Sequence, residues 1–178
     1  MNNPEGMQGF TLIELMVVVT VLGIIVAVGV PSFSTLIDNN RMSTMTNDLS
    51  STLQYARSEA VRHRGAVQVS AIDGDVKDGL RVWIDVDGNG AFGSGDTELR
   101  VLEVDPAMIT LAAELNSGAL KNVAFSFNAR GESSLVSPLM LSLCDDRKGD
   151  YGRQLELLAS GALRLIKSAD CSGGSANA

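Results

Sequence analysis

The sequence predicts an α+β protein in which one long N-terminal helix packs on antiparallel β-sheets. The first observation is an apolar run near the start, because no charged residue occurs from Leu15 to Ile37. The second is a stripe of apolar residues at helical spacing directly after that run. The third is a series of segments that alternate apolar and polar residues over the remainder of the chain. Since the helical pattern comes first and strand patterns follow, the two element types are segregated along the chain.

The apolar run is long enough to cross a bilayer as a helix, which requires about 20 mostly apolar residues. Glu14 lies just inside its front edge. A charged side chain in lipid is costly and usually has a function. We therefore predict that residues 10–37 form a transmembrane helix segment and that Glu14 has a specific role.

The helix is expected to continue to about Arg64, and Gly65 is a suitable C-terminal stop. Its second half carries apolar residues at steps of three and four, which is typical of an amphipathic helix. They are Met42, Met45, Leu49, Leu53, Ala56 and Ala60. Basic residues gather near the predicted end, where cations interact favourably with the helix dipole. They are Arg57, Arg62, His63 and Arg64.

Strands are predicted wherever apolar and polar residues alternate with a period of two, which favours antiparallel sheets with one buried face. The segments are 66–72, 80–86, 99–103, 123–128, 139–144, 154–157 and 163–165. Clusters of Gly, Asp and Asn separate them. We predict that residues 38–178 form one globular domain of ordinary size.

Composition and charge exclude some classes of function. The formal net charge is −7, whereas a general nucleic-acid binder needs a basic surface. The two cysteines, Cys144 and Cys171, would pair in an oxidising compartment and would remain free thiols in a reducing one. The chain has a single histidine, His63, and no recognisable catalytic triad or phosphate-binding loop. We do not expect an enzyme.

One loop has two interpretations. The segment from Asp85 to Gly90 matches the start of a Ca²⁺ loop, D-x-D-x-N-G, with Asp96 at the position of the last ligand. Asp85, Asp87, Asn89 and Asp96 would then bind the ion. However, the last ligand of such loops is normally Glu, and the flanks here are predicted strands. A tight turn without metal is the alternative, and no other cofactor is expected.

The segment Gly9-Phe10-Thr11-Leu12-Ile13-Glu14-Leu15 resembles the leader of type IV prepilins and type II secretion pseudopilins. The resemblance implies that residues 1–9 are a leader, that a prepilin peptidase cleaves after Gly9, and that the new N-terminus at Phe10 is methylated. It also implies that Glu14 pairs with the Phe10 amine of a neighbouring subunit during assembly.

Two later segments are similar to minor pilins of the GspH/FimT/FimU group. They are residues 53–62 and residues 143–147, the latter followed by Gly152-Arg153 and Ser160-Gly161. The resemblance implies a pilin-like fold and a subunit held in the inner membrane with a periplasmic domain. Its expected partners are other minor pilins, the major pilin and the inner-membrane assembly platform. The expected role is to prime filament assembly and to join a tip complex to the shaft, and a type II secretion pseudopilin is the alternative.

DNA uptake is a further alternative within that group. DNA-binding relatives carry a C-terminal Gly-Arg-x-Arg motif, and the corresponding stretch here is Gly161-Ala162-Leu163-Arg164. The first arginine is missing, so only Arg164 and Lys167 remain as candidate DNA contacts. DNA is therefore not an expected partner.

Overall fold

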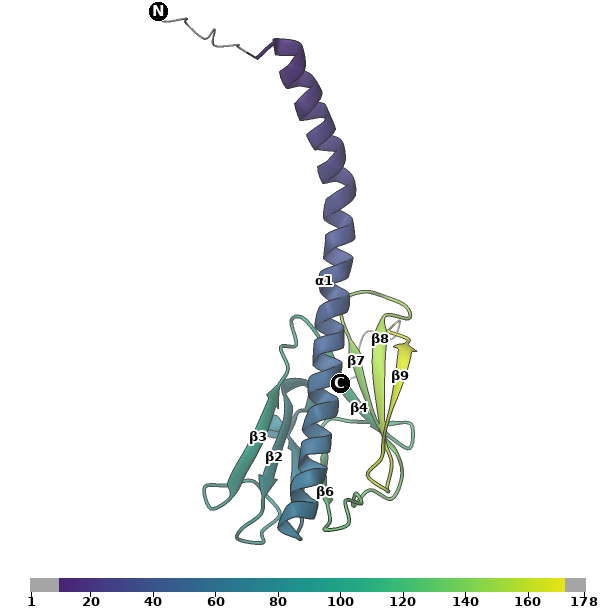
Figure 1. Ribbon diagram of the computed structural model, residues 1–178. Helices are drawn as coiled ribbons and strands as arrows, with labels where there is room; N and C mark the ends of the chain where they lie inside the picture. Colours follow the sequence, from purple (N-terminus) through teal and green to yellow (C-terminus); the bar gives the residue numbers. More distant parts are fainter. Residues whose placement is uncertain (1–9, 172–178) are drawn as a thin grey trace, which may run out of the picture. The chain divides into compact units, whose positions relative to one another are not determined.

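The computed structural model describes residues 10–171, apart from the side chains of residues 28 and 30–32 (Figure 1). The chain divides into two compact units, residues 1–40 and residues 41–178. Helix α1 (Leu12–His63) belongs to both and matches the predicted helix to within two residues at its start and one at its end. In the described residues after α1, strands follow with two short 3-10 turns between the first two of them.

In the first unit, large apolar side chains of α1 are exposed from Leu12 to Val26 and again from Phe33 to Ile37. Among residues 10–171, no helix has a stretch that is both long and apolar enough to cross a membrane. The transmembrane segment predicted for residues 10–37 is therefore not confirmed and stays a prediction.

The second unit contains two antiparallel sheets. The first has the order β3-β2-β1-β6. Its strands are β1 (Val67–Ala71), β2 (Gly79–Ile84), β3 (Thr97–Glu103) and β6 (Ala124–Phe127). The second has the order β5-β4-β7-β8-β9. Its strands are β4 (Thr110–Leu115), β5 (Gly118–Leu120), β7 (Leu139–Cys144), β8 (Gly152–Leu157) and β9 (Leu163–Ala169).

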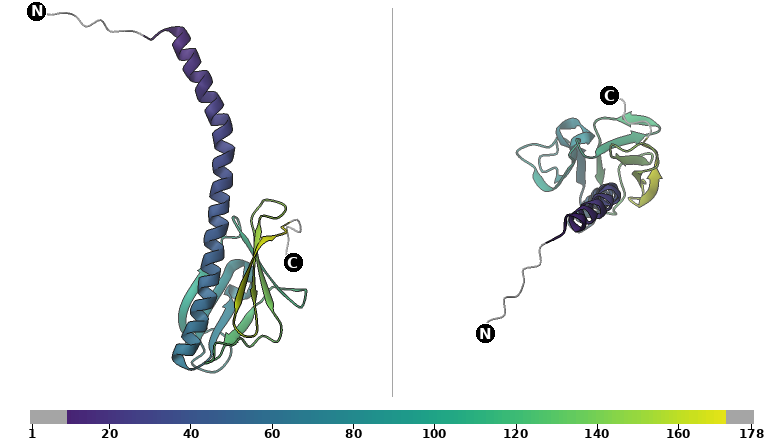
Figure 2. Two further views of the ribbon diagram at one scale, coloured as in Figure 1. Left: turned by 45° about the vertical axis from the view of Figure 1, so that its right-hand side comes forward. Right: turned by 90° about the horizontal axis from the view of Figure 1, so that it is seen from above.

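The core of this unit lies between α1 and the two sheets. The predicted stripe on the helix is confirmed, because Met42, Leu49, Leu53, Ala56 and Ala60 are buried and Met45 is partly buried. In Figure 1, β2 and β3 lie to the left of the C-terminal part of α1 and β8 and β9 to its right, and the left view of Figure 2 shows the same part of the helix beside the strands. Inward residues of β1, β2, β3, β4, β6, β7 and β8 belong to the same cluster. For β7 and β8, period-two patterning identified the buried face, because Leu139, Leu141, Leu143, Leu155 and Leu157 are all buried.

Strands β4 and β5 were not predicted from the sequence. The β4 segment Thr110-Leu-Ala-Ala-Glu-Leu contains Ala and Glu, which are depleted in strands. Its strand conformation comes from pairing with β7, in which Leu111 lies opposite Leu143 and Ala113 opposite Leu141. Tertiary pairing thus outweighs local propensity in this segment.

Strand β2 ends at Ile84, two residues earlier than predicted. Alternation along residues 80–86 predicts that Trp83 lies on the same face as Arg81 and Asp85, yet its side chain is only 2% exposed. Phe92, from the loop after β2, packs edge-on against Trp83 with ring centroids 5.6 Å apart. A loop that folds back over the outer face of the sheet therefore buries this residue.

Candidate functional site

The first candidate site is the start of α1. Phe10 is 79% exposed and precedes the helix. The Thr11 hydroxyl accepts a hydrogen bond from the backbone N–H of Glu14 at 3.3 Å, which caps the first turn. Glu14 is exposed between the exposed side chains of Ile13 and Leu15. Gly9, the predicted cleavage residue, lies outside the described residues.

The exposed apolar surface continues along α1 well beyond Glu14. Its large members are Leu12, Ile13, Leu15, Met16, Val17, Val18, Val19, Val21, Leu22, Ile24, Ile25, Val26, Phe33, Leu36 and Ile37. Contiguous apolar surface of this size marks contact with protein or membrane. Glu14 is the acidic residue of its first turn, so the surface can combine apolar contact with one charge.

The structure brings together the three carboxylates among the four residues predicted to bind Ca²⁺. Carboxylate oxygens of Asp85, Asp87 and Asp96 lie within 4.8 Å of one another. The Asn89 amide contacts this group, because its Nδ2 donates to Asp87 Oδ2 at 2.7 Å, while its Oδ1 accepts a hydrogen bond from the Ala91 N–H at 2.7 Å. Carboxylates at this separation could hold a hard cation.

The same carboxylates also organise the loop through backbone hydrogen bonds. Asp85 accepts from the N–H groups of Gly88 at 2.7 Å and Gly90 at 3.0 Å. Asp96 accepts from Val86 at 3.0 Å and Gly93 at 2.8 Å. These contacts fit the tight-turn interpretation and explain how Phe92 is carried onto Trp83. Calcium binding stays a prediction.

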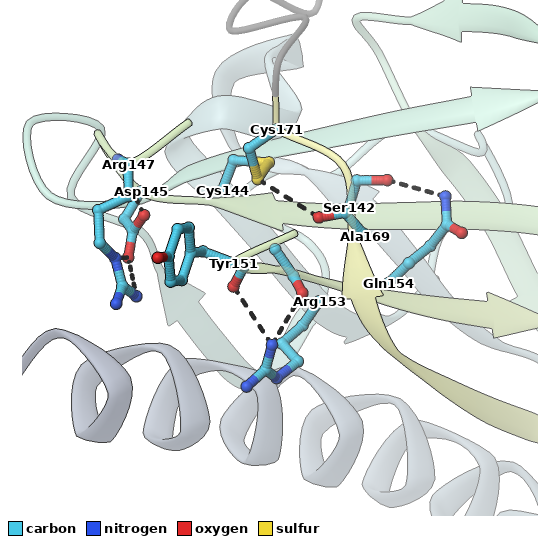
Figure 3. The surroundings of a disulfide bond; sticks show 10 residues. Ser142, Cys144, Asp145, Arg147, Tyr151, Arg153, Gln154, Ala169 and Cys171 are labelled. Atoms are coloured by element: carbon cyan, nitrogen blue, oxygen red, sulfur yellow. Dashed lines mark hydrogen bonds and ion pairs between the residues drawn. A yellow bond between two sulfur atoms is a disulfide. The ribbon is translucent and has the colours of Figure 1, made fainter. Parts of the chain in front are cut away.

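The disulfide between Cys144 and Cys171 is present, with the two Cα atoms 5.8 Å apart (Figure 3). It connects the end of β7 to the residues that follow β9. Gly152 lies against it, and a Cβ at this position would be 2.6 Å from the Cys171 sulfur and 2.7 Å from the Ala169 oxygen. Glycine is therefore required there by close approach.

The segment after Cys144 forms an ion pair and a ring contact, both visible in Figure 3. Arg147 Nε donates to Asp145 Oδ2 at 2.8 Å. The Arg147 guanidinium also lies over the Tyr151 ring, 4.5 Å from its centroid. These contacts give the 143–147 segment a structural role beside the disulfide.

The basic residues near the end of α1 do not act as one group. Arg62 and His63 both contact Glu59, and the His63 Nε2 to Glu59 Oε2 distance is 3.2 Å. Arg64, with a φ of 53°, takes the left-handed position that ends the helix, in place of the predicted Gly65. Arg57 points elsewhere, because its Nε donates to the Gly131 carbonyl at 2.9 Å.

The candidate DNA contacts lie on β9, the edge strand of the second sheet. Arg164 and Lys167 are both exposed. Arg164 Nε lies 3.4 Å from Glu156 Oε2 on the neighbouring strand, so an acidic side chain offsets its charge. The arrangement offers a nucleic acid little positive surface at this position.

Comparison with protein families identifies the chain. Residues 45–161 match the family described as Type II transport protein GspH, and residues 6–30 match the prokaryotic N-terminal methylation motif. The first match covers more than half of the chain. The chain belongs to the GspH family.

The relatives of this GspH-family chain are fimbrial, pilin and pseudopilin proteins. It is 26% identical over 148 residues to the type IV major fimbrial protein FimA of Dichelobacter nodosus, covering 81% of this chain and 85% of that protein. The minor pilin FimU of Pseudomonas aeruginosa has a similar structure, with a TM-score of 0.56 and 28% identity over 72% of this chain and 90% of FimU. The chain is thus a type IV pilin or pseudopilin.

A third relative has the same fold at lower identity. The minor pseudopilin EpsH of the Vibrio cholerae type 2 secretion system has a TM-score of 0.52 and 17% identity, over 72% of this chain and 98% of EpsH. The long N-terminal helix and antiparallel sheets are therefore shared by pilins and pseudopilins.

Sequence reasoning missed one contact within the GspH-family range. Arg57 was assigned to the helix end, and its contact with Gly131 was not expected. Arg57 lies inside the 53–62 segment, and Gly131 and Gly161 lie in two distant turns. Nothing local in the sequence indicates that these three residues meet.

Proposed function

We propose that this chain is a minor pilin of a type IV pilus that primes filament assembly and joins the tip complex to the major-pilin shaft. The observation that carries the proposal is the exposed apolar surface of α1 from Leu12 to Ile37, with Glu14 at its start. The likeness to FimU, at 28% identity over most of both chains, supports the minor-pilin role. Its partners are other minor pilins and the major pilin.

Processing and location follow from the leader. A prepilin peptidase cleaves after Gly9 and methylates Phe10, and the match of residues 6–30 to the methylation motif supports this step. The subunit is then held in the inner membrane, at the assembly platform, with its β-domain in the periplasm. The disulfide between Cys144 and Cys171 suits that oxidising compartment.

Assembly depends on two properties of α1. Helices of neighbouring subunits replace lipid around the apolar surface, so the subunit can leave the membrane without exposing that surface to water. Glu14 pairs with the positively charged Phe10 amine of a neighbour, which removes the cost of two unpaired charges in an apolar environment. This ion pair sets the register of the incoming subunit.

Deletion and complementation in the native host tests the role. Deletion of the gene should lower the number of surface pili, and the full chain supplied in trans should restore it. The mature subunit should be found in sheared filaments at a small fraction of the major pilin. Normal pilus number and subunit composition in the deletion strain would refute the minor-pilin proposal.

A type II secretion pseudopilin is the second candidate, favoured by the family match to Type II transport protein GspH. The same deletion distinguishes the two machines. Loss of exoprotein secretion with normal pili would favour the pseudopilin, whereas loss of pili with normal secretion favours the pilin.

For the DNA-binding alternative we expect weak and salt-sensitive binding at most. The net charge of −7 and the pairing of Arg164 with Glu156 motivate this expectation. Gel shifts with the full chain in detergent provide the measurement. Submicromolar affinity at physiological salt, lost in Arg164→Ala and Lys167→Ala, would favour DNA uptake instead.

A further inference from the structure

The β8–β9 hairpin lies at the margin of the second sheet, and β9 is its edge strand. An edge strand presents unpaired backbone groups and can detach from its sheet or pair with another chain. The hairpin has a closed end, the turn at residues 158–162, and an open end, where Gly152 lies opposite Ala169. Contacts hold it at both ends.

At the closed end, Arg57 of α1 reaches two turns from different sheets. Its Nε donates to the Gly131 carbonyl at 2.9 Å, in the turn that follows β6 of the first sheet. Its Nη2 donates to the Ser160 carbonyl at 3.4 Å, in the β8–β9 turn. One guanidinium therefore connects the helix, the first sheet and the hairpin.

The two turns also touch directly. A Cβ at Gly161 would lie 1.9 Å from the Gly131 carbonyl oxygen, and a Cβ at Gly131 would lie 2.8 Å from Arg57 Nε. The Ser133 N–H donates to the Ala159 carbonyl at 2.8 Å. The φ angle is 75° at Gly131 and 74° at Gly161, so the backbone conformation favours glycine at both positions, as does the lack of space for a side chain.

Arginine suits this position better than lysine. Its planar guanidinium presents several N–H donors in fixed directions, so one side chain can serve two carbonyls. Hydrogen bonds from a charged donor are stronger than those between neutral groups. Lysine would keep the charge but would not preserve this geometry.

At the open end, the Cys144–Cys171 disulfide attaches the hairpin to the rest of the domain. Cys171, two residues beyond β9, is bonded to Cys144 at the end of β7. The Cys171 N–H donates to the Gly149 carbonyl at 2.9 Å, which attaches the end of the hairpin to the loop before β8. Gly152 allows the close approach of the sulfur.

We infer that Arg57 and the Cys144–Cys171 disulfide form a two-point clamp that holds the β8–β9 hairpin to the domain at its two ends. Arg57 is the positioning residue of the closed end, and the disulfide holds the open end. Either point keeps β9 in the sheet when the other is lost. The clamp would be the same in a pilus subunit and in a secretion pseudopilus subunit.

Hydrogen exchange on the full chain in detergent provides the test. In Arg57→Lys, the amides of Ser133 and Gly161 should exchange about tenfold faster or more, because the hydrogen bonds of the charged donor are lost. Arg62→Lys is the matched control, since Arg62 contacts Glu59 and should leave both rates unchanged. Unchanged rates at both amides in Arg57→Lys would overturn the inference.

Reduction of the disulfide in the wild-type chain tests the open end of the hairpin. Because it needs no substitution, this test remains decisive if Arg57→Lys fails to fold. Exchange at the Cys171 amide should rise, while Ser133 and Gly161 keep their protection. Release of the closed end by reduction alone would contradict two separate points of attachment.

Reduction of the disulfide in Arg57→Lys removes both points of attachment at once and gives the clearest test. Only reduced Arg57→Lys should lose protection in the middle of the hairpin, around the Leu155–Leu165 pair. Protection around the Val69–Val82 pair of the first sheet should persist and show that the domain is folded. Loss of the middle of the hairpin in either single perturbation would refute the clamp.

Discussion

At the scale of single residues, Glu14 is a carboxylate in the first turn of α1 among exposed apolar side chains. Such a charge costs a few kcal/mol in lipid unless it is paired or near the interface. A membrane anchor alone would not need it, so the residue is expected to act in assembly.

We predict that Glu14→Ala inserts, is processed and folds with its disulfide intact, but supports fewer filaments. The physical reason is loss of the partner for the Phe10 amine of a neighbour. The measurement is filament yield beside the membrane level of the variant, with Leu15→Ala as the matched control. Wild-type assembly at equal protein level would mean that packing alone positions the helix.

A second residue-scale prediction concerns acid titration of Glu132. The Arg130 guanidinium, followed by the Asn128 amide, holds the pKa of Glu132 below its ordinary value of 4.5. A lowered folded-state pKa contributes stability above pH 4.5 that is lost as the pH falls through the folded pKa. Because the pair is exposed, the effect on stability should be small.

The titration of the Glu132 carboxyl, followed by NMR, should therefore have its midpoint below 4.5, and Arg130→Ala should raise that midpoint. Arg64→Ala is the control, since it removes a positive charge from the end of α1. A midpoint that does not respond to Arg130→Ala would show that this ion pair does not form in solution.

At the scale of elements, the disulfide closes a loop with a sequence separation of 27 residues. In the chain-entropy model a loop of this length contributes roughly 3.5 kcal/mol to stability. We predict that Cys144→Ser with Cys171→Ser lowers the free energy of unfolding by about 2–4 kcal/mol. Denaturant unfolding provides the measurement, and reduced wild type should match the double variant. Equal stability of oxidised and reduced protein would contradict this prediction.

The loop between β2 and β3 offers a second test at this scale. Asp85→Ala leaves the N–H groups of Gly88 and Gly90 without their acceptor, and should destabilise the chain by about 1–2 kcal/mol. Trp83 is the single tryptophan, so its fluorescence should shift to the red as Phe92 moves away. Asp146→Ala removes an equal charge from another loop and is the control.

Thermal unfolding, followed by the fluorescence of Trp83, tests whether the loop binds Ca²⁺. A rise in unfolding temperature on addition of CaCl₂, reversed by chelator and absent in Asp85→Ala, would support a calcium site. An unchanged unfolding temperature at millimolar Ca²⁺ favours the tight-turn interpretation, in which backbone N–H groups satisfy the carboxylates.

At the scale of the whole molecule, maturation should remove the leader. We predict that protein from peptidase-positive cells has a methylated Phe10 at its N-terminus and lacks residues 1–9. Gly9→Val should block cleavage, because the larger side chain replaces the small residue at the cut, whereas Gly6→Val should be cleaved normally. Intact mass decides, and a mature mass that retains Met1 to Gly9 would refute the pilin processing route.

The helix and seven of the described strands could be predicted from the sequence. They depend on local information, such as the spacing from Met42 to Ala60 or the alternation in residues 139–144, which the chain carries regardless of its partners. The disulfide could be predicted because two cysteines allow a single pairing. The resemblance also identified the family, because leader and signature segments are contiguous in sequence.

Features that depend on residues far away in the sequence became apparent only in the folded chain. Strand β4 forms against local propensity because β7 supplies its hydrogen bonds. Trp83 is buried because Phe92 returns over it from the loop after β2. Arg57 meets Gly131 because α1 and both sheets converge there, across 74 residues of sequence. Periodicity reports which face of an element is apolar, whereas contacts between turns depend on how the elements pack.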